Sequence, residues 1–142
     1  MPANESSSAA FDPVRTYVHL TDDGEGATPI PVTDDFWQTI ETRSRLHEGR
    51  LLTAYHFQAG RWDHWERHPA GDEVVCLLAG AMDLVLEAGD GDERVVELRG
   101  RSACIVPRGA WHRGIVRAPS DALFVTPGKG TQHRPLSKGD HT

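Results

Sequence analysis

The sequence predicts an all-β protein, an antiparallel β-barrel or jelly roll preceded by a short N-terminal helix. From residue 51 onward, short runs rich in β-branched and aromatic residues alternate with turn sequences that contain glycine and proline. No helical period separates these runs, and a series of strands at such spacing is typical of closed antiparallel folds. The predicted strands cover residues 51–58, 62–68, 73–79, 81–88, 93–99, 102–107, 111–117 and 122–127.

A length of 142 residues suits one domain with a single core, and the sequence contains no internal repeat. The opening stretch is rich in Ser, Ala and Asn, which predicts disorder. The closing stretch contains so many glycines and prolines that we expect no strand in it. The predicted parts are a disordered N-terminus over 1–12, an arm with a short helix over 13–48, the barrel over 49–128 and a flexible C-terminal tail over 129–142.

Two elements are predicted within the N-terminal arm. Tyr17–Leu20 has the composition of a short edge strand. The Thr-Asp-Asp sequence at 33–35 predicts a helix N-terminus, because small polar and acidic residues suit the positive end of a helix. The apolar stripe of Phe36, Trp37 and Ile40 on this helix is expected to lie over a mouth or edge of the barrel.

Charge and composition exclude several classes of function. The net charge of −6 argues against binding to nucleic acid or to an anionic membrane surface. The N-terminus has neither the basic start nor the apolar stretch of a secretory signal, and no segment has the apolar length of a membrane span. We therefore expect a cytoplasmic protein. Cys76 and Cys104 lack CxxC spacing and are expected to be reduced, partly buried small hydrophobes.

Four side chains that can bind a metal come from three separate predicted strands. Glu66 and His68 close one strand, Glu73 opens the next, and His112 lies near the start of a later one. Neutral imidazole and carboxylate are the usual ligands of Zn, Mn, Fe and Ni in proteins. Such side chains converge only if their strands close around one interior, as in a small barrel. The sequence therefore predicts a metal site inside the barrel.

Strand alternation supports this interpretation. His64, Glu66 and His68 share one face of their strand, and three titratable groups on an inward face are unfavourable unless they are paired or bind an ion. In the competing interpretation the barrel holds no metal, and Glu66 pairs with one of three arginines, Arg67, Arg108 or Arg113.

The spacing of these residues resembles the first motif of the cupin superfamily. In that motif a glycine is followed after five residues by His-x-His, after three or four more by Glu, and after six more by Gly. Gly60, Glu66, His68, Glu73 and Gly80 keep this spacing, with a glutamate where the family normally has its first histidine.

The second cupin motif is also matched in part. It reads Gly, five residues, Pro-x-Gly, two residues, His, three residues and Asn. Gly100, Pro107, Gly109 and His112 fit it with one extra residue before the proline, and Val116 replaces the asparagine. The resemblance covers residues 50–128 and implies a conical antiparallel barrel.

The resemblance implies that Glu66, His68, Glu73 and His112 hold one divalent metal ion. The usual cupin ligand set has three histidines and one glutamate, so a second carboxylate makes this site harder. That favours Fe²⁺, Mn²⁺ or Zn²⁺ over copper. If Glu66 turns away, the remaining three residues form the two-His, one-carboxylate set of non-haem iron enzymes.

Two further histidines are candidates for proton transfer. His64 has the inward parity but lies outside the motif, so we interpret it as a pocket group. One of Tyr55 and His56 must face inward, and an inward His56 would be either a proton carrier or a hydrogen-bonded core histidine. His133 lies in the tail and is expected at the surface, although the tail could fold back over the barrel mouth.

Three functions fit this sequence. The first is a metal-dependent enzyme acting on a small polar molecule, foremost an oxygenase and otherwise a lyase or isomerase. The second is a cupin that binds or senses a small molecule without converting it. The third is a structural barrel without metal. The fold does not decide between them, because cupins host many reactions.

A homodimer is the predicted assembly. Cupins of this size are usually homodimers, and the run at 74–79 is too apolar to expose one face to water. Trp65, Cys76 and Trp111 have outward parity, so either the N-terminal arm or a second subunit should cover them.

Overall fold

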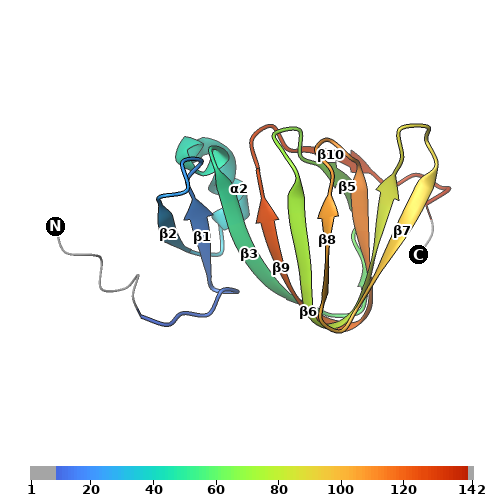
Figure 1. The fold of residues 1–142 in the computed structure, drawn as a ribbon, viewed down its shortest axis with the longest axis horizontal. Coiled ribbons are helices and arrows are strands. Elements are labelled where there is room, and N and C mark those ends of the chain that lie inside the picture. The colour runs from blue at the N-terminus through green and yellow to red at the C-terminus, as the bar shows by residue number, and fades with distance from the viewer. Residues whose placement is uncertain (1–8, 141–142) are drawn as a thin grey trace.

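The computed structural model describes residues 9–140, which form an antiparallel β-barrel with a short helical segment at one side (Figure 1). The predicted all-β jelly roll is therefore confirmed. Two strands of fifteen residues each, β6 (Glu73–Glu87) and β9 (His112–Thr126), pair with each other and dominate the sheet. Within residues 9–140, no helix is both long and apolar enough to cross a membrane.

The remaining elements are short. The helical segment consists of α2 (Phe36–Thr39), η1 (Ile40–Thr42) and η2 (Ser44–His47). The other strands are β1 (Thr16–Leu20), β2 (Ala27–Pro31), β3 (Arg50–Phe57), β4 (Gly60–Arg61), β5 (His64–Arg67), β7 (Glu93–Arg99), β8 (Ser102–Val106) and β10 (Gln132–Pro135).

Each long strand exchanges its outer partners halfway along, which divides the strands into two walls. The first half of β6 pairs with β8 and its second half with β7. The first half of β9 pairs with β4 and β5, and its second half pairs with β3. Because β6 and β9 remain paired on both sides of the exchange, they connect the two walls of the barrel.

The partner exchange occurs at a β-bulge. At this point the sequence predicts that each of the two long strands is interrupted. Register shifts lie between Leu77 and Met82, and Gly80 there has φ of 103°. A side chain at Gly80 would collide with Pro119 and Ser120, and the Ser120 hydroxyl accepts a hydrogen bond from the Ala81 N–H at 3.1 Å. The predicted strands 73–79 and 81–88 are thus one strand, as are 111–117 and 122–127, because glycine and proline mark bulges as well as turns.

The core fills the barrel with apolar side chains from the inward faces of the strands. Val75, Leu77 and Met82 of β6 are fully buried and pack with Val116 and Phe124 of β9. Cys76 is only half-buried, as the predicted alternation requires.

The N-terminal arm forms the elements that its sequence predicts. Strand β1 is confirmed, but β2 pairs with its outer side, so β1 lies inside the sheet and is not an edge strand. Helix α2 begins after Asp35, and Phe36 is buried against Tyr17 and Leu51 while Trp37 is 50% exposed. Of the predicted disordered stretch 1–12, residues 1–8 lie outside the described residues.

The C-terminal segment departs from the prediction. Residues 132–135 form β10, which pairs with β5, although we expected no strand beyond residue 128. This segment also covers Trp65, which is 1% exposed and whose indole N–H donates a hydrogen bond to Asp140 at 3.0 Å. The predicted cover of Trp65, by the N-terminal arm or by a second subunit, is therefore wrong, because the chain's own C-terminal segment buries this side chain.

Candidate metal centre

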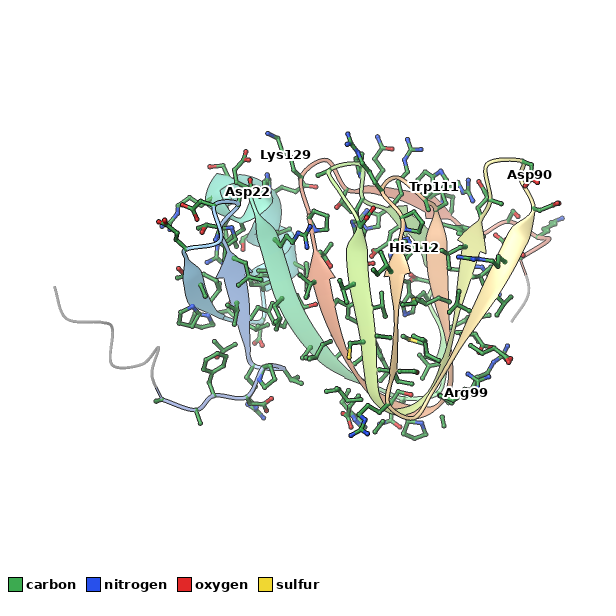
Figure 2. All side chains as sticks on the ribbon, viewed as in Figure 1. Asp22, Asp90, Arg99, Trp111, His112 and Lys129 are labelled. Atoms are coloured by element: carbon green, nitrogen blue, oxygen red, sulfur yellow. The ribbon has the colours of Figure 1, made fainter. Side chains whose placement is uncertain are left out.

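The four predicted ligands come together at one end of the barrel. Glu66 lies on β5 opposite His112, the first residue of β9, and His68 directly follows β5. Glu73 is the first residue of β6. Figure 2 shows His112 away from the end of the barrel that carries Arg99. Strand ends that meet at one barrel opening thus bring these side chains together.

The ligand atoms of the four residues all lie within 4.8 Å of one another. His68 Nε2 lies 3.2 Å from Glu66 Oε1 and 3.3 Å from Glu73 Oε2. His112 Nε2 lies 3.1 Å from Glu73 Oε1 and 3.8 Å from Glu66 Oε1. Two ligand atoms about 2.0–2.2 Å from the same ion stand about 2.9–3.4 Å apart, so three of these four separations fit a shared metal ion.

Three buried atoms of the cluster lack a hydrogen bond. They are His68 Nε2, Glu73 Oε1 and His112 Nε2, whose short contacts within the cluster do not have hydrogen-bond geometry. Buried polar atoms are normally satisfied, and an unpaired one costs about 1–3 kcal/mol. A cation between them would satisfy all three at once, so the residues fit a divalent metal.

The other atoms of these ligands are held by hydrogen bonds to the protein. His68 Nδ1 donates to the Thr131 hydroxyl at 2.9 Å, and His112 Nδ1 donates to the carbonyl of Ala110 at 3.0 Å. The Thr126 hydroxyl donates to Glu73 Oε2 at 2.5 Å. Such bonds fix the tautomer that leaves Nε2 free to bind a metal, and they hold the imidazole rings in place.

The carboxylates and imidazoles shift one another's pKa values. Burial alone would raise the pKa of Glu73, but the adjacent imidazoles of His112 and His68 lower it to about 2. Burial alone would lower the pKa of His68, but the adjacent carboxylates of Glu66 and Glu73 raise it to about 9. At neutral pH the metal-free cluster therefore holds two carboxylates and a proton on His68.

Metal binding to this cluster should release protons. A metal ligand must be a neutral imidazole, so a metal ion has to displace the proton that His68 retains up to a pH of about 9. Raising the pH from 6 to 8 weakens this competition and should strengthen Mn²⁺ binding up to about tenfold per unit. Calorimetry in buffers of different ionisation enthalpy measures the released proton. An affinity independent of pH over this range would contradict the protonated state of His68.

The two predicted proton carriers have different positions. His64 lies beside the cluster, with Nε2 3.6 Å from Glu66 Oε2. His56 points away from it: its side chain is 52% exposed and its Nδ1 lies 2.7 Å from Asp121 Oδ1. Tyr55 takes the inward position and stacks on Phe57. The assignment of His56 to the interior is thus corrected, since alternation allows only one of the two neighbours to face inward.

The competing interpretation, in which Glu66 pairs with an arginine, is not supported for two of the three arginines named. Arg67 Nε donates to the side chain of Gln132 at 2.6 Å, and Arg108 Nε donates to the carbonyl of Pro69 at 2.7 Å. Arg113 lies over the Trp65 ring at 5.1 Å. Four histidines, His64, His68, His112 and His133, each have a ring nitrogen within 3.2–3.8 Å of a Glu66 carboxylate oxygen.

His133 is exposed, as predicted, and the C-terminal segment folds back so that this histidine lies beside the site. His133 of β10 lies opposite Glu66 in the sheet register, and its Nε2 is 3.5 Å from Glu66 Oε2. The sequence places His133 among glycines and prolines, so the short strand that brings it to the site has no periodic signal. Thr126 and Thr131, which hold Glu73 and His68, were not identified either, because threonine carries no ligand signature.

The comparisons with known proteins concern the fold. No family model matches the sequence, and a comparison with curated proteins finds no match either. Among solved structures, a cupin-2 domain protein from Shewanella frigidimarina matches at 15% identity and a TM-score of 0.46, covering 55% of this chain and 70% of that chain. A mutant of Bacillus subtilis oxalate decarboxylase matches at 17% identity and a TM-score of 0.52, covering 61% of this chain and 24% of that chain. The fold is that of a cupin.

A further similar structure has a different description. Peruvianin-I, described as a cysteine peptidase from Thevetia peruviana latex, matches this cupin fold at 18% identity and a TM-score of 0.52, covering 63% of this chain and 58% of that chain. The chain thus spans little more than half of Peruvianin-I and about a quarter of the oxalate decarboxylase. These likenesses describe architecture, and function has to be argued from the site.

Proposed function

We propose that this cupin binds one divalent metal ion, Fe²⁺, Mn²⁺ or Zn²⁺, and acts as an enzyme on a small polar molecule. The observation that carries the proposal is the convergence of three buried, unsatisfied donor atoms beside two carboxylates. Carboxylate and imidazole ligands suit these three metals. Glu66, His68, Glu73 and His112 would hold the ion, and the two carboxylates would neutralise its charge.

The reaction class follows from the chemistry of such a centre. A bound metal of this kind supplies a Lewis acid or a site for O₂. We place an oxygenase first and a lyase or isomerase second. The chain's own contribution is to fix the ligands through Thr126 and Thr131 and to exclude water from the inner side, where His112 is fully buried.

Substrate access is from the side of Glu66. Its side chain is 21% exposed, whereas those of His68, Glu73 and His112 are at most 5% exposed. An open pocket of about 460 Å³ lies on this side, lined by Asp63, His64, His133, Arg134 and Pro135. With one metal ion bound, His64 remains free to take up or release a proton at the pocket, and we propose it for that role.

A panel experiment tests the function. Protein loaded with Fe²⁺, Mn²⁺ or Zn²⁺ is incubated with small carboxylic and hydroxy acids, and oxygen uptake and products are followed. Metal-dependent conversion with oxygen uptake supports an oxygenase, and conversion without it supports a lyase or isomerase. Binding without conversion of any member would instead favour a sensing or binding cupin. The His112→Ala variant serves as the control for contaminating activity.

We also propose a cytoplasmic homodimer, with its contact on a different face from the one containing Trp65. Five aliphatic residues are directly paired across β1, β3, β9, β6 and β8 on the outer side of the sheet: Val18, Leu52, Val125, Val74 and Ile105. Ile105 is 62% exposed, and the other four are half-buried. A continuous aliphatic row is unusual on a sheet face in water, and two copies can cover it through a symmetric contact.

Light scattering at micromolar concentration should then report about twice 15.6 kDa. Ile105→Glu places a charge in the aliphatic row and should shift the protein toward the monomer. Val95→Glu is the matched control, because Val95 of β7 is 53% exposed but lies outside the row. A wild-type monomer, or equal effects of both variants, would contradict this contact.

A further inference from the structure

We propose a second divalent-cation site beside the first, formed by His64, Glu66 and His133, with the Glu66 carboxylate bridging the two ions. The inference deepens the proposed function and rests on the inner metal site described above. The ligand atoms of these three residues also lie within 4.8 Å of one another, on the pocket side of Glu66.

The two oxygens of Glu66 face different pairs of histidines. Oε1 lies 3.2 Å from His68 Nε2 and 3.8 Å from His112 Nε2. Oε2 lies 3.6 Å from His64 Nε2 and 3.5 Å from His133 Nε2. The outer separations are too long for good hydrogen bonds but close to the spacing of about 2.9–3.4 Å between two ligands of one ion. One carboxylate thus stands between two sets of imidazole nitrogens.

His64 is oriented as metal-binding histidines are. Its Nδ1 lies 2.6 Å from Asp63 Oδ1, so the N–H donates to that carboxylate and the Nε2 lone pair faces Glu66. A carboxylate behind a histidine fixes the tautomer and raises the basicity of the ligand nitrogen. Asp63 is itself exposed, which is consistent with a partner that orients His64 from the solvent side.

His133 reaches the same oxygen from another element. The pairing of β10 with β5 places His133 opposite Glu66, and the rings of His64 and His133 lie 4.9 Å apart between centroids. Three ligands from two paired strands therefore converge without any rearrangement of the backbone. Their side chains are 38%, 21% and 59% exposed for His64, Glu66 and His133, so an ion here would exchange more readily than the inner one.

A second ion also explains the glutamate at position 66. A neutral histidine at this position has one lone pair and can serve only one ion, whereas a carboxylate offers two oxygens and can bridge a pair. In two-metal sites the ions stand about 3.5–4 Å apart. The one position where this chain departs from the usual cupin ligand pattern is thus the position that a bridged pair requires to be a carboxylate.

The charge of the paired site points to the class of ligand. Two divalent ions carry four positive charges, and Glu66 and Glu73 supply only two negative charges to bind them. Two-metal sites clamp oxygen atoms of a substrate between the ions. We therefore infer that the pocket accepts a small anion with carboxylate or phosphate oxygens. When His64 Nε2 binds an ion it cannot also carry a proton, so metal stoichiometry decides between its two roles.

Titration with Mn²⁺ alone tests the inference. The wild type should bind two equivalents, the second more weakly, and the second should produce the broadened electron paramagnetic resonance signal of coupled ions. His64→Ala and His133→Ala should each lose one equivalent. Glu66→His should retain the inner equivalent and lose the outer one. His56→Ala is the matched control and should still bind two, because His56 is an exposed histidine beside an aspartate but lies away from the cluster.

The outcomes distinguish failure of the second site from failure of the inner site. One equivalent in the wild type, unchanged by His64→Ala and His133→Ala, would overturn the second site and leave the inner metal in place. Two equivalents in Glu66→His would overturn the bridge. No bound Mn²⁺ in the wild type would overturn this inference together with the inner site. Circular dichroism on each variant confirms that a lost equivalent reflects lost ligands and not lost folding.

Discussion

Replacing His68, Glu73 or His112 with alanine should reduce metal affinity by far more than any other single change in the barrel. Loss of a group that merely orients a ligand typically weakens metal binding about 10–100-fold, so loss of a ligand should weaken it at least that much. The effect should be largest at His112 and Glu73, which are 0% and 2% exposed and so have no water to replace them. Competition against a chromophoric chelator measures the change.

Two further variants belong to this experiment, one with a weaker expected effect and one as a control. Glu66→Gln keeps the size of the side chain but removes its charge, and it should weaken binding less than loss of His112 because one carboxylate remains. His19→Gln alters a histidine that is equally buried but hydrogen-bonded to the Glu48 carbonyl, away from the cluster, and should leave affinity unchanged. Full metal occupancy in all three alanine variants would show that the ion binds elsewhere.

Metal binding should stabilise the folded protein substantially. An ion that binds the native state alone adds about 2.7 kcal/mol to the free energy of unfolding at a concentration one hundred times its Kd. For a domain of this size that corresponds to an increase in Tm of about 5–10 °C. The physical reason is that the ion neutralises Glu66 and Glu73 and satisfies three buried atoms that lack hydrogen bonds.

Thermal unfolding with added Mn²⁺ and with added chelator measures this stabilisation. The His112→Ala variant should show no shift with metal, which separates binding at the site from a general salt effect. An unchanged Tm for the wild type in metal and in chelator would mean that the unsatisfied atoms are not metal ligands. A shift of equal size in the variant would lead to the same conclusion.

The sequence was sufficient to find the inner cluster because strand alternation and motif spacing both act over short distances. Glu66, His68, Glu73 and His112 each lie at a strand end next to a turn, and the barrel closure that the strands predict brings such ends together. The same alternation gives Cys76 its predicted outward parity, and its neighbours Val75 and Leu77 are buried inside. These features depend on a period of two and on turn chemistry, which a single sequence contains.

Other features depend on tertiary pairing and had no such signal. Strand β10 is four residues long between glycine-rich stretches, and only its pairing with β5 places His133 at Glu66 and covers Trp65. Strand alternation requires that one of Tyr55 and His56 face inward, but it does not say which. The aromatic packing around Phe124 selects Tyr55. At Gly80 the sequence marks a break, and the partner strand turns it into a bulge.

Elemental analysis of the protein purified without a histidine tag tests the central claim most directly. We expect at least one equivalent of iron, manganese or zinc per chain in the wild type, and less than a tenth of that in the His112→Ala variant purified in parallel. A wild-type protein that contains no stoichiometric metal, and takes up none when Fe²⁺, Mn²⁺ or Zn²⁺ is supplied, would contradict the account.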